Sequence, residues 1–241
     1  MSKQFWLVAA AVLVVLIGIF SLSGKNNSGS NGSSASKPTQ HIEGAGKDGI
    51  TLVEYGDYQC PYCGAYFSTI KQVEALYSNE ITFQFRNFPL TSLHQNAFAA
   101  ARAAEAAGLM GQFWQMHDLL YTQNQEYYGS NQKIQTWINA SSPETIFAQD
   151  AQSLGLNVQK FEQLYASDQV NNLINADESA GNALNVNATP SFYLDGKPIQ
   201  ANNTVSAFAT LINAEIAKKT GQQPTTTTSP TSTGSTQQSK Q

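Results

Sequence analysis

Cys60 and Cys63 are the only cysteines in this chain of 241 residues, and Pro61 and Tyr62 lie between them. Two thiols at this spacing could bind a metal, form a static disulfide, or form a pair that opens and closes in thiol exchange. A structural zinc site needs four Cys or His ligands, and the folded part of the chain adds only two histidines, which are not at ligand spacing. A static bridge across so short a loop would stabilise the fold little, because the stabilisation grows with loop length. The sequence therefore favours a redox-active pair and predicts no metal site.

The local sequence gives the two thiols different roles. We expect Cys60 at the N-terminus of a helix with Pro61 in its first turn, where unpaired backbone N–H groups and the helix dipole favour a thiolate. The thiolate is the species that attacks in thiol–disulfide exchange. Cys63 lies one turn further, on the apolar face that Phe67 and Ile70 continue, so we expect it to be buried. Cys60 is thus the predicted exposed nucleophile and Cys63 the predicted resolving thiol. Their own disulfide is the only redox cofactor that the sequence calls for.

The segments around the cysteines are predicted to form a strand–helix–strand unit. Residues 50–55 are a β-prone run, and residues 81–88 alternate between apolar and polar side chains, as a strand does. With the helix between them, this order gives a βαβ unit with a right-handed crossover. Alternation along the first strand places Glu54 on the side of Ile50 and Leu52, where we expect it to be partly buried.

The remainder of the folded part is predicted to be a helical block followed by a hairpin and a last helix. The helical block covers about 95–184 and should contain four or five helices. Two short strands, at 191–194 and 197–200, flank an Asp-Gly dipeptide that is typical of a tight turn. The last helix is expected at about 203–218. The predicted domain is therefore 48–219, an α/β domain with an inserted helical subdomain.

The two ends of the chain differ from this domain in composition. Residues 1–23 have a positive head and an apolar run close to the length that crosses a bilayer, which predicts a single-pass signal anchor. A cleaved secretory signal is the alternative, and either would place the domain outside the cytoplasm, where disulfides persist. Residues 24–47 and 220–241 are polar and low in apolar content, so they are predicted to be a disordered linker and a disordered tail. The net charge of −4, without a basic stripe, argues against nucleic acid as a partner.

Several motifs together resemble the DsbA-like thiol–disulfide oxidoreductases of the thioredoxin-fold superfamily. They are "VEYGDYQCPYC", "FRNFPL", "FWQMHDLL" and "TPSFYLDGKPI", and the resemblance covers about 49–218. It implies a thioredoxin-like fold with a helical insertion. It also implies that the Thr189–Pro190 bond is cis and that this loop faces Cys60. A cis bond forms a tight turn, which leaves the Thr189 backbone free to pair with an extended substrate strand.

The resemblance also implies a role for Glu54. An acidic residue at this position lies near the buried cysteine in the family, and here it could accept the proton of Cys63 during resolution. The alternative for Glu54 is an ion pair with Arg86 on the neighbouring strand.

The function that the resemblance implies is disulfide transfer to reduced exported polypeptides. Pro61, Tyr62, Thr189 and Pro190 would contact the substrate, and a membrane reoxidase, quinone-linked as the family suggests, would restore the disulfide. One departure weakens the expectation of strong oxidising power. The best-known oxidising member has His where this chain has Tyr62, and Tyr supplies no positive charge. A reductase or isomerase on the same fold, or a non-enzymatic surface binding module, are the alternatives.

Overall fold

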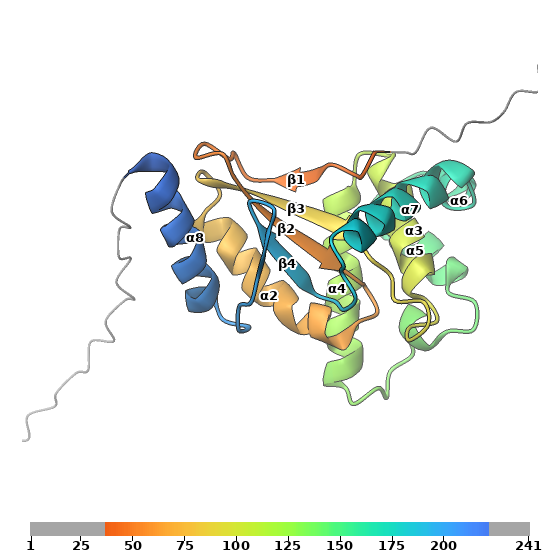
Figure 1. Cartoon of the computed structure of the whole chain (residues 1–241). Coiled ribbons are helices and arrows are strands. Elements are labelled where there is room, and N and C mark those ends of the chain that lie inside the picture. The colour runs from red at the N-terminus through yellow and green to blue at the C-terminus, as the bar shows by residue number, and fades with distance from the viewer. Residues whose placement is uncertain (1–36, 222–241) are drawn as a thin grey trace, which may run out of the picture. The chain divides into compact units, whose positions relative to one another are not determined.

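The computed structural model describes residues 37–221, and its centre is a five-stranded mixed sheet with the strand order β1-β3-β2-β4-β5 (Figure 1). The strands are β1 (His41–Glu43), β2 (Ile50–Gly56), β3 (Ile81–Asn87), β4 (Ser191–Leu194) and β5 (Lys197–Ile199). β2 and β3 are parallel, and the other neighbouring strands are antiparallel. The predicted βαβ unit is therefore confirmed.

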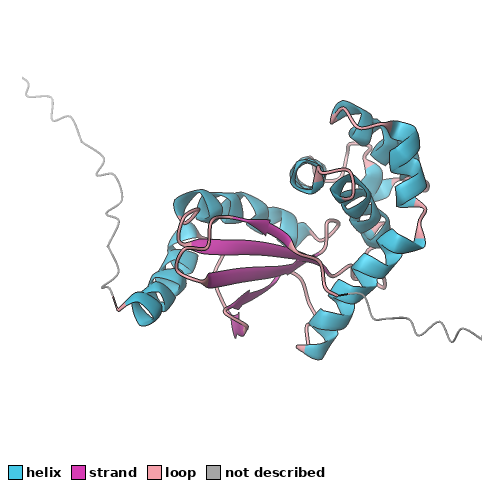
Figure 2. Cartoon of the chain, turned by 90° about the horizontal axis from the view of Figure 1, so that it is seen from above, coloured by secondary structure: helices cyan, strands magenta, loops and turns pink. Residues whose placement is uncertain are grey.

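The helices form two groups around this sheet. They are α2 (Pro61–Leu76), α3 (Ala97–Gly108), α4 (Phe113–Gly129), α5 (Glu144–Ser153), α6 (Val158–Tyr165), α7 (Asp168–Ala183) and α8 (Val205–Thr220), with a short 3-10 helix at Trp137–Asn139. The helices from α3 to α7 gather beside one end of the sheet, whereas α2 and α8 lie alongside its strands (Figure 2). The chain thus has the predicted α/β fold with an inserted helical subdomain.

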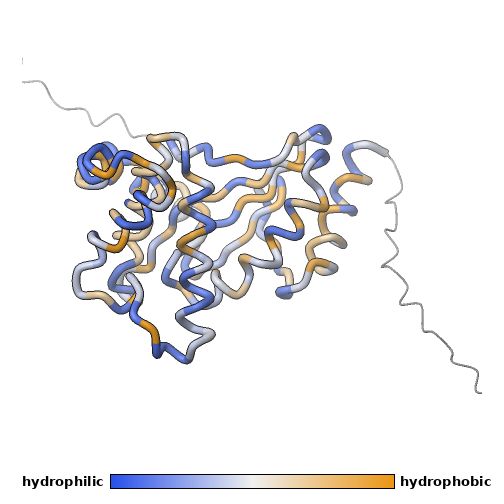
Figure 3. The backbone as a smooth tube through the Cα atoms, turned by 180° about the vertical axis from the view of Figure 1, so that it is seen from behind, coloured by the Kyte–Doolittle hydropathy of each residue, from blue (hydrophilic) through white to orange (hydrophobic). Residues whose placement is uncertain are grey.

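The main core lies between one face of the sheet and the helices. Ile50 and Leu52 of β2 are buried in it with Phe83 and Phe85 of β3, and Val73 of α2 packs into the same cluster. Hydrophobic residues recur along these central strands (Figure 3). Because successive side chains of a strand point to opposite faces, alternation along β2 and β3 fixes which residues face α2.

The hairpin of β4 and β5 supports the loop that precedes it. Asp195 and Gly196 both have positive φ angles, 48° and 73°, as the tight turn requires. Pro198 lies on β5, which is an edge strand, so the backbone N–H that proline lacks costs the sheet no interior hydrogen bond. β4 also pairs with β2, the strand that leads to the cysteines.

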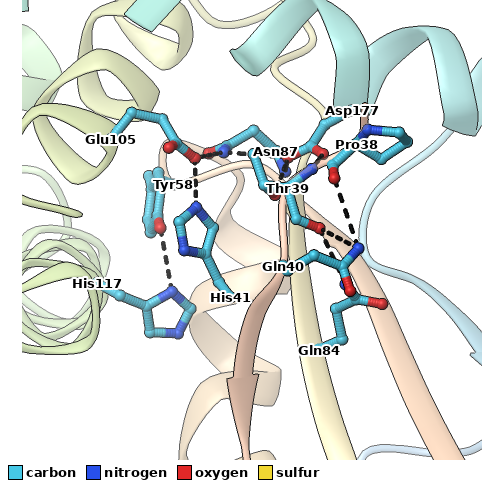
Figure 4. A network of polar contacts seen from close by, with 10 residues as sticks. All are labelled: Pro38, Thr39, Gln40, His41, Tyr58, Gln84, Asn87, Glu105, His117 and Asp177. Carbon is cyan, nitrogen blue, oxygen red and sulfur yellow. Dashed lines mark hydrogen bonds and ion pairs between the residues drawn. The ribbon is translucent and has the colours of Figure 1, made fainter. Parts of the chain in front are cut away.

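The predicted boundary between linker and domain is wrong, because the domain begins before residue 48. β1 pairs with β3 in the sheet, with His41 opposite Phe85. Thr39 donates hydrogen bonds from its backbone N–H and its hydroxyl to Asp177, both at 2.7 Å (Figure 4). The composition of this segment predicted disorder, but its polar groups are bonded to partners far away in the sequence.

The other predictions for the ends fall outside the described residues. These are the signal anchor at 1–23, most of the linker and nearly all of the tail. Within residues 37–221, no helix is long and apolar enough to span a membrane.

Candidate active site

Cys60 occupies the position just before the first turn of α2. Its backbone is extended, with φ −67° and ψ 124°, and Pro61 is the first helical residue. The carbonyl oxygen of Cys60 accepts the first helical hydrogen bond, from the N–H of Gly64, at 3.1 Å. Cys63 lies one turn along the helix and is fully buried, as predicted. This arrangement aims free backbone N–H groups at the Cys60 sulfur.

Helix α4 of the insertion fixes the loop that carries Cys60. The side-chain amide of Asn124 donates to the carbonyl oxygens of Tyr58, at 2.8 Å, and Cys60, at 3.2 Å. The hydroxyl of Tyr128 donates to the carbonyl oxygen of Gln59 at 3.1 Å. Sequence reasoning missed Asn124 and Tyr128, because their partners are backbone groups more than sixty residues away.

A second loop meets Cys60 from the hairpin side. The Thr189–Pro190 bond is cis, as the resemblance implies. The sulfur of Cys60 lies 3.4 Å from the carbonyl oxygen of Thr189 and donates a hydrogen bond to it when protonated. The structure thus brings together the cysteine pair and both residues of the Thr-Pro loop, although about 130 positions separate them in the sequence.

The predicted exposure of Cys60 is wrong. Cys60 is only 3% exposed, and its sulfur is in contact with the backbone of Thr189. The site nevertheless lies close to the surface, since Tyr62 in the same turn is 71% exposed. An attacking sulfur therefore reaches Cys60 only after the side chain or the Thr189 loop shifts.

The pKa values of the two thiols are shifted in opposite directions, as the predicted roles of nucleophile and resolving thiol require. The pKa of Cys60 is lowered from 9.0 to about 6, mainly because the Cys63 thiol donates a hydrogen bond to its sulfur. The backbone N–H groups of Cys63 and Tyr62 and the Thr189 side chain lower it further, whereas burial opposes them. Burial is also the main reason that the pKa of Cys63 is raised well above its usual value. At neutral pH, Cys60 is the thiolate and Cys63 is the thiol that stabilises it.

Glu54 is buried beneath the cysteine pair, on the face of β2 that the sequence predicted. Its pKa is raised from 4.5 to about 8, first by burial and then by the negative charges of Glu74 and Cys60. The alternative ion pair with Arg86 is not formed, because the guanidinium of Arg86 donates to the hydroxyl of Tyr55 at 3.1 Å. Glu54 therefore holds a proton at neutral pH.

A further carboxyl group, largely buried and missed in the sequence, belongs to Glu74 on α2. Its pKa is raised to about 7, with burial as the largest cause. Lys71 lies between three carboxylates, at 2.9 Å from Glu74, 3.1 Å from Glu43 and 3.6 Å from Asp118. The Lys71–Glu74 pair is spaced at i,i+3 on a helix, which is the only signal that the sequence offered for it.

A groove of about 350 Å³ lies beside the exposed side of the site. Its lining includes Tyr62, Tyr66, Thr189, Pro190 and Phe192, and it contains no charged side chain. Three of the four residues predicted to contact substrate thus line one cavity, and Pro61 lies next to it in the chain. An uncharged groove with aromatic and amide side chains suits an extended polypeptide.

Both cysteines are free thiols in this structure. Among residues 37–221, no group of three or more His, Cys, Asp or Glu side chains could hold a metal ion.

Comparison with known families agrees with this geometry. A family model described as Thioredoxin matches residues 36–214. The chain belongs to the thioredoxin family. Among curated relatives of this thioredoxin-family protein is the Na(+)/H(+) antiporter NhaA 1 of Mycolicibacterium gilvum, which is 32% identical over 159 residues, covering 65% of this chain and 23% of the relative. The NhaA 1 protein of Salinispora arenicola is 30% identical over 177 residues, covering 73% of this chain and 25% of the relative. The chain thus spans about a quarter of the length of these relatives.

The solved structures define which form of the thioredoxin fold this is. Oxidised BdbD from Bacillus subtilis superposes with a TM-score of 0.62 at 20% identity, covering 76% of this chain and 97% of that one. The α-DsbA1 protein of Wolbachia pipientis superposes with a TM-score of 0.60 at 19% identity, covering 78% and 96%. This thioredoxin-family protein therefore has the DsbA-like fold.

Proposed function

We propose that this protein is an exported thiol–disulfide oxidoreductase that introduces disulfide bonds into exported polypeptides. The observation that carries the proposal is the Cys60–Cys63 pair at the start of α2, whose two pKa values are shifted in opposite directions. The DsbA-like fold and the uncharged groove beside Thr189 and Pro190 support it. The antiporter names of the curated relatives carry no transport function to this chain, because it spans only about a quarter of them.

The proposed reaction begins with the oxidised protein. A substrate thiolate attacks the Cys60 sulfur, the Cys60–Cys63 bond breaks, and Cys63 leaves as a thiolate. Because the pKa of Cys63 is well above that of Glu54, the buried Glu54 carboxyl donates its proton to this thiolate. The product is a mixed disulfide between Cys60 and the substrate.

The second step releases the substrate. Another thiolate of the substrate attacks the substrate sulfur of the mixed disulfide, and Cys60 leaves as a thiolate. Two electrons have then passed from the substrate dithiol to the protein. Cys60 is a good leaving group because its pKa is low. A membrane reoxidase would take up these electrons, and residues 1–23 would hold the protein at that membrane.

The direction of transfer follows from the energy of the reduced state. At pH 7, a pKa of Cys60 lowered from 9.0 to about 6 stabilises the reduced protein by about 1.4 kcal/mol, because only the interval between this pKa and the pH contributes. The potential of the couple rises by roughly 30 mV. A protein whose reduced form is stabilised in this way is an oxidant. The lowered pKa of Cys60 therefore favours oxidation of substrates over reduction or isomerisation.

The proposal is tested with the full-length protein, its Cys60→Ser variant and its Cys63→Ala variant. The oxidised wild type should restore activity to reduced, unfolded ribonuclease A, and Cys60→Ser should not. Cys63→Ala, mixed with oxidised glutathione, should accumulate a mixed disulfide between Cys60 and glutathione, with the second glutathione leaving as a thiol, because the resolving thiol is absent. A redox titration against glutathione gives the potential of the Cys60–Cys63 couple, and so shows whether the protein oxidises or reduces its substrates. A potential near that of thioredoxin, about −270 mV, would contradict the oxidase function, and wild type inactive in exchange would favour a binding module.

A further inference from the structure

The side chain of Asp57 joins the loop before Cys60 to the loop after β3. One carboxylate oxygen accepts the backbone N–H of Gln59 at 2.7 Å. The other accepts the backbone N–H of Leu90 at 2.9 Å and a hydrogen bond from Nδ1 of His94 at 2.7 Å. The carboxylate is fully buried, whereas the imidazole of His94 is 16% exposed. Three donors thus hold a buried carboxylate in one orientation.

The same residue touches both cysteines through its backbone. The carbonyl oxygen of Asp57 accepts the N–H of Cys60 at 3.0 Å. The backbone N–H of Asp57 faces the Cys63 sulfur and partly offsets the rise in that thiol's pKa. A buried negative charge so close to Cys60 disfavours the thiolate, unless a cation compensates it. Tyr62, between the cysteines, cannot supply that cation.

His94 can supply the positive charge. Its hydrogen bond with Asp57 raises the pKa of the imidazole, and the Cys60 thiolate raises it further. Because coupling between two sites is reciprocal, the charged imidazole favours the thiolate by the same amount. Among the described residues, Asp57 and Cys60 are the charged groups that bear on His94.

Other titratable groups around Cys60 do not substitute for His94. Glu54 faces Cys60 from β2 and Tyr128 bears on it from α4. The pKa of Glu54 is raised to about 8 and that of Tyr128 is raised above 10.0, so both are neutral at pH 7. Of these groups, His94 is the one that can carry a positive charge.

We propose that His94 and Asp57 form a positioning pair that sets the reactivity of Cys60, with the imidazolium of His94 cancelling the charge of the buried Asp57 carboxylate. This inference rests on the proposed exchange function. The pair holds the active-site loop in place and keeps the Cys60 thiolate favourable. As the pH rises through the pKa of His94, the imidazole loses its charge and the Asp57 carboxylate is left uncompensated. The protein then becomes a weaker oxidant.

The experiment compares two substitutions in the full-length, reduced protein. His94→Gln keeps a hydrogen-bond donor for Asp57 but removes the charge, whereas His94→Lys keeps a charge and removes the imidazole. The readouts are the thiolate absorbance near 240 nm as a function of pH and the equilibrium with glutathione. Cys60→Ser identifies the absorbance change that belongs to Cys60.

We expect His94→Gln to raise the pKa of Cys60 by about one unit, a tenfold change in its ionisation. The equilibrium with glutathione should shift about tenfold, or about 30 mV, towards a weaker oxidant. His94→Lys should stay within about threefold of wild type. If both variants change the pKa of Cys60 equally, or neither changes it, the pair acts only on structure and the proposal is overturned. Absence of exchange in the wild type would instead contradict the proposed function, so the two failures are distinguishable.

Discussion

The backbone oxygen of Thr189 lies 3.4 Å from the sulfur of Cys60, and the hydroxyl of the same threonine is buried without a hydrogen-bond partner among the described residues. The carbonyl oxygen can accept a bond only from the protonated thiol. The hydroxyl can donate to the sulfur only once the sulfur is charged, and the Thr189 side chain accordingly lowers the pKa of Cys60. When Cys60 ionises, its sulfur thus loses the hydrogen bond to the Thr189 carbonyl oxygen and can accept one from the Thr189 hydroxyl. Ionisation also weakens the contact between the sulfur and the Thr189 backbone, which favours exposure of the sulfur for reaction.

Substitution of Thr189 tests this exchange of partners. Thr189→Val has nearly the same shape but no hydroxyl, so the pKa of Cys60 should rise above its value of about 6. Thr189→Ser keeps the hydroxyl and should leave the pKa close to that of wild type. Thiolate absorbance against pH gives both values. Equal pKa values in the two variants would show that the hydroxyl does not act on the sulfur.

The order in which the two thiols ionise gives a second prediction. Iodoacetamide should modify one thiol per chain in the reduced protein, and the rate should rise with a midpoint near pH 6. Mass spectrometry should place the label on Cys60, because burial keeps Cys63 protonated. Label on Cys63, or a midpoint near 9, would mean that the sulfur of Cys60 is not stabilised as the thiolate.

A third prediction concerns the pH dependence that Glu54 gives to stability. Folding raises the pKa of Glu54 from 4.5 to about 8. Between pH 4.5 and about pH 8, the folded state therefore holds a proton that the unfolded chain has lost. The contribution of Glu54 to the free energy of unfolding therefore falls as the pH rises through this window. Glu54→Gln should remove this pH-dependent loss. At pH 8 its free energy of unfolding should exceed that of wild type by a few kcal/mol, since each pKa unit corresponds to about 1.4 kcal/mol.

Urea unfolding of the reduced proteins at pH 5 and pH 8 measures this difference. Glu126→Gln is the matched control, because Glu126 is exposed on α4 and its substitution should leave the pH dependence unchanged. A difference between Glu54→Gln and wild type that stays constant with pH would mean that Glu54 ionises normally.

Local features of the sequence predicted the parts of the site that depend on neighbours in the chain. The helix start at Cys60, the burial of Cys63 and the face of β2 that carries Glu54 all follow from periodicity. The exposure of Cys60 was predicted wrongly, because the sulfur contacts Thr189, a residue remote in the sequence. Only the resemblance to a family pointed to that loop.

Interactions between remote segments explain the other misses. The sequence predicted only that His94 caps a helix or faces solvent, and that Asp57 shapes the loop before Cys60, because nothing local links two residues 37 positions apart. The boundary at residue 48 was placed too late for the same reason. The composition of that segment predicts disorder, because it is polar, and composition does not show that Asp177, on α7, accepts its hydrogen bonds.

The close approach of α2 and α4 gives a fourth prediction. A Cβ atom at Gly64 would lie 1.9 Å from the side-chain oxygen of Asn124, the residue that holds the loop of Cys60. Gly64→Ala should therefore destabilise the protein by about 1–3 kcal/mol and slow exchange. Gly129→Ala is the control, because a Cβ there meets no atom within 4 Å and alanine is the better helix former. Thermal unfolding of both variants and the wild type measures the difference in stability. Equal stability of the two would show that the helices can separate without cost.

A fifth prediction tests whether residues before 48 belong to the domain. The hydroxyl of Thr39 donates to Asp177, whose carboxylate is fully buried and also accepts the backbone N–H of Asn87 at 3.0 Å. Thr39→Val removes this donor and keeps the shape, so a buried carboxylate loses one of its partners. Unfolding should become easier by about 1–3 kcal/mol. Thr210→Val should change stability by less than about 0.5 kcal/mol, because the hydroxyl of Thr210 is exposed on α8. If Thr39→Val were as stable as Thr210→Val in urea, the segment before β1 would not stabilise the fold. The linker would then extend to the start of β1.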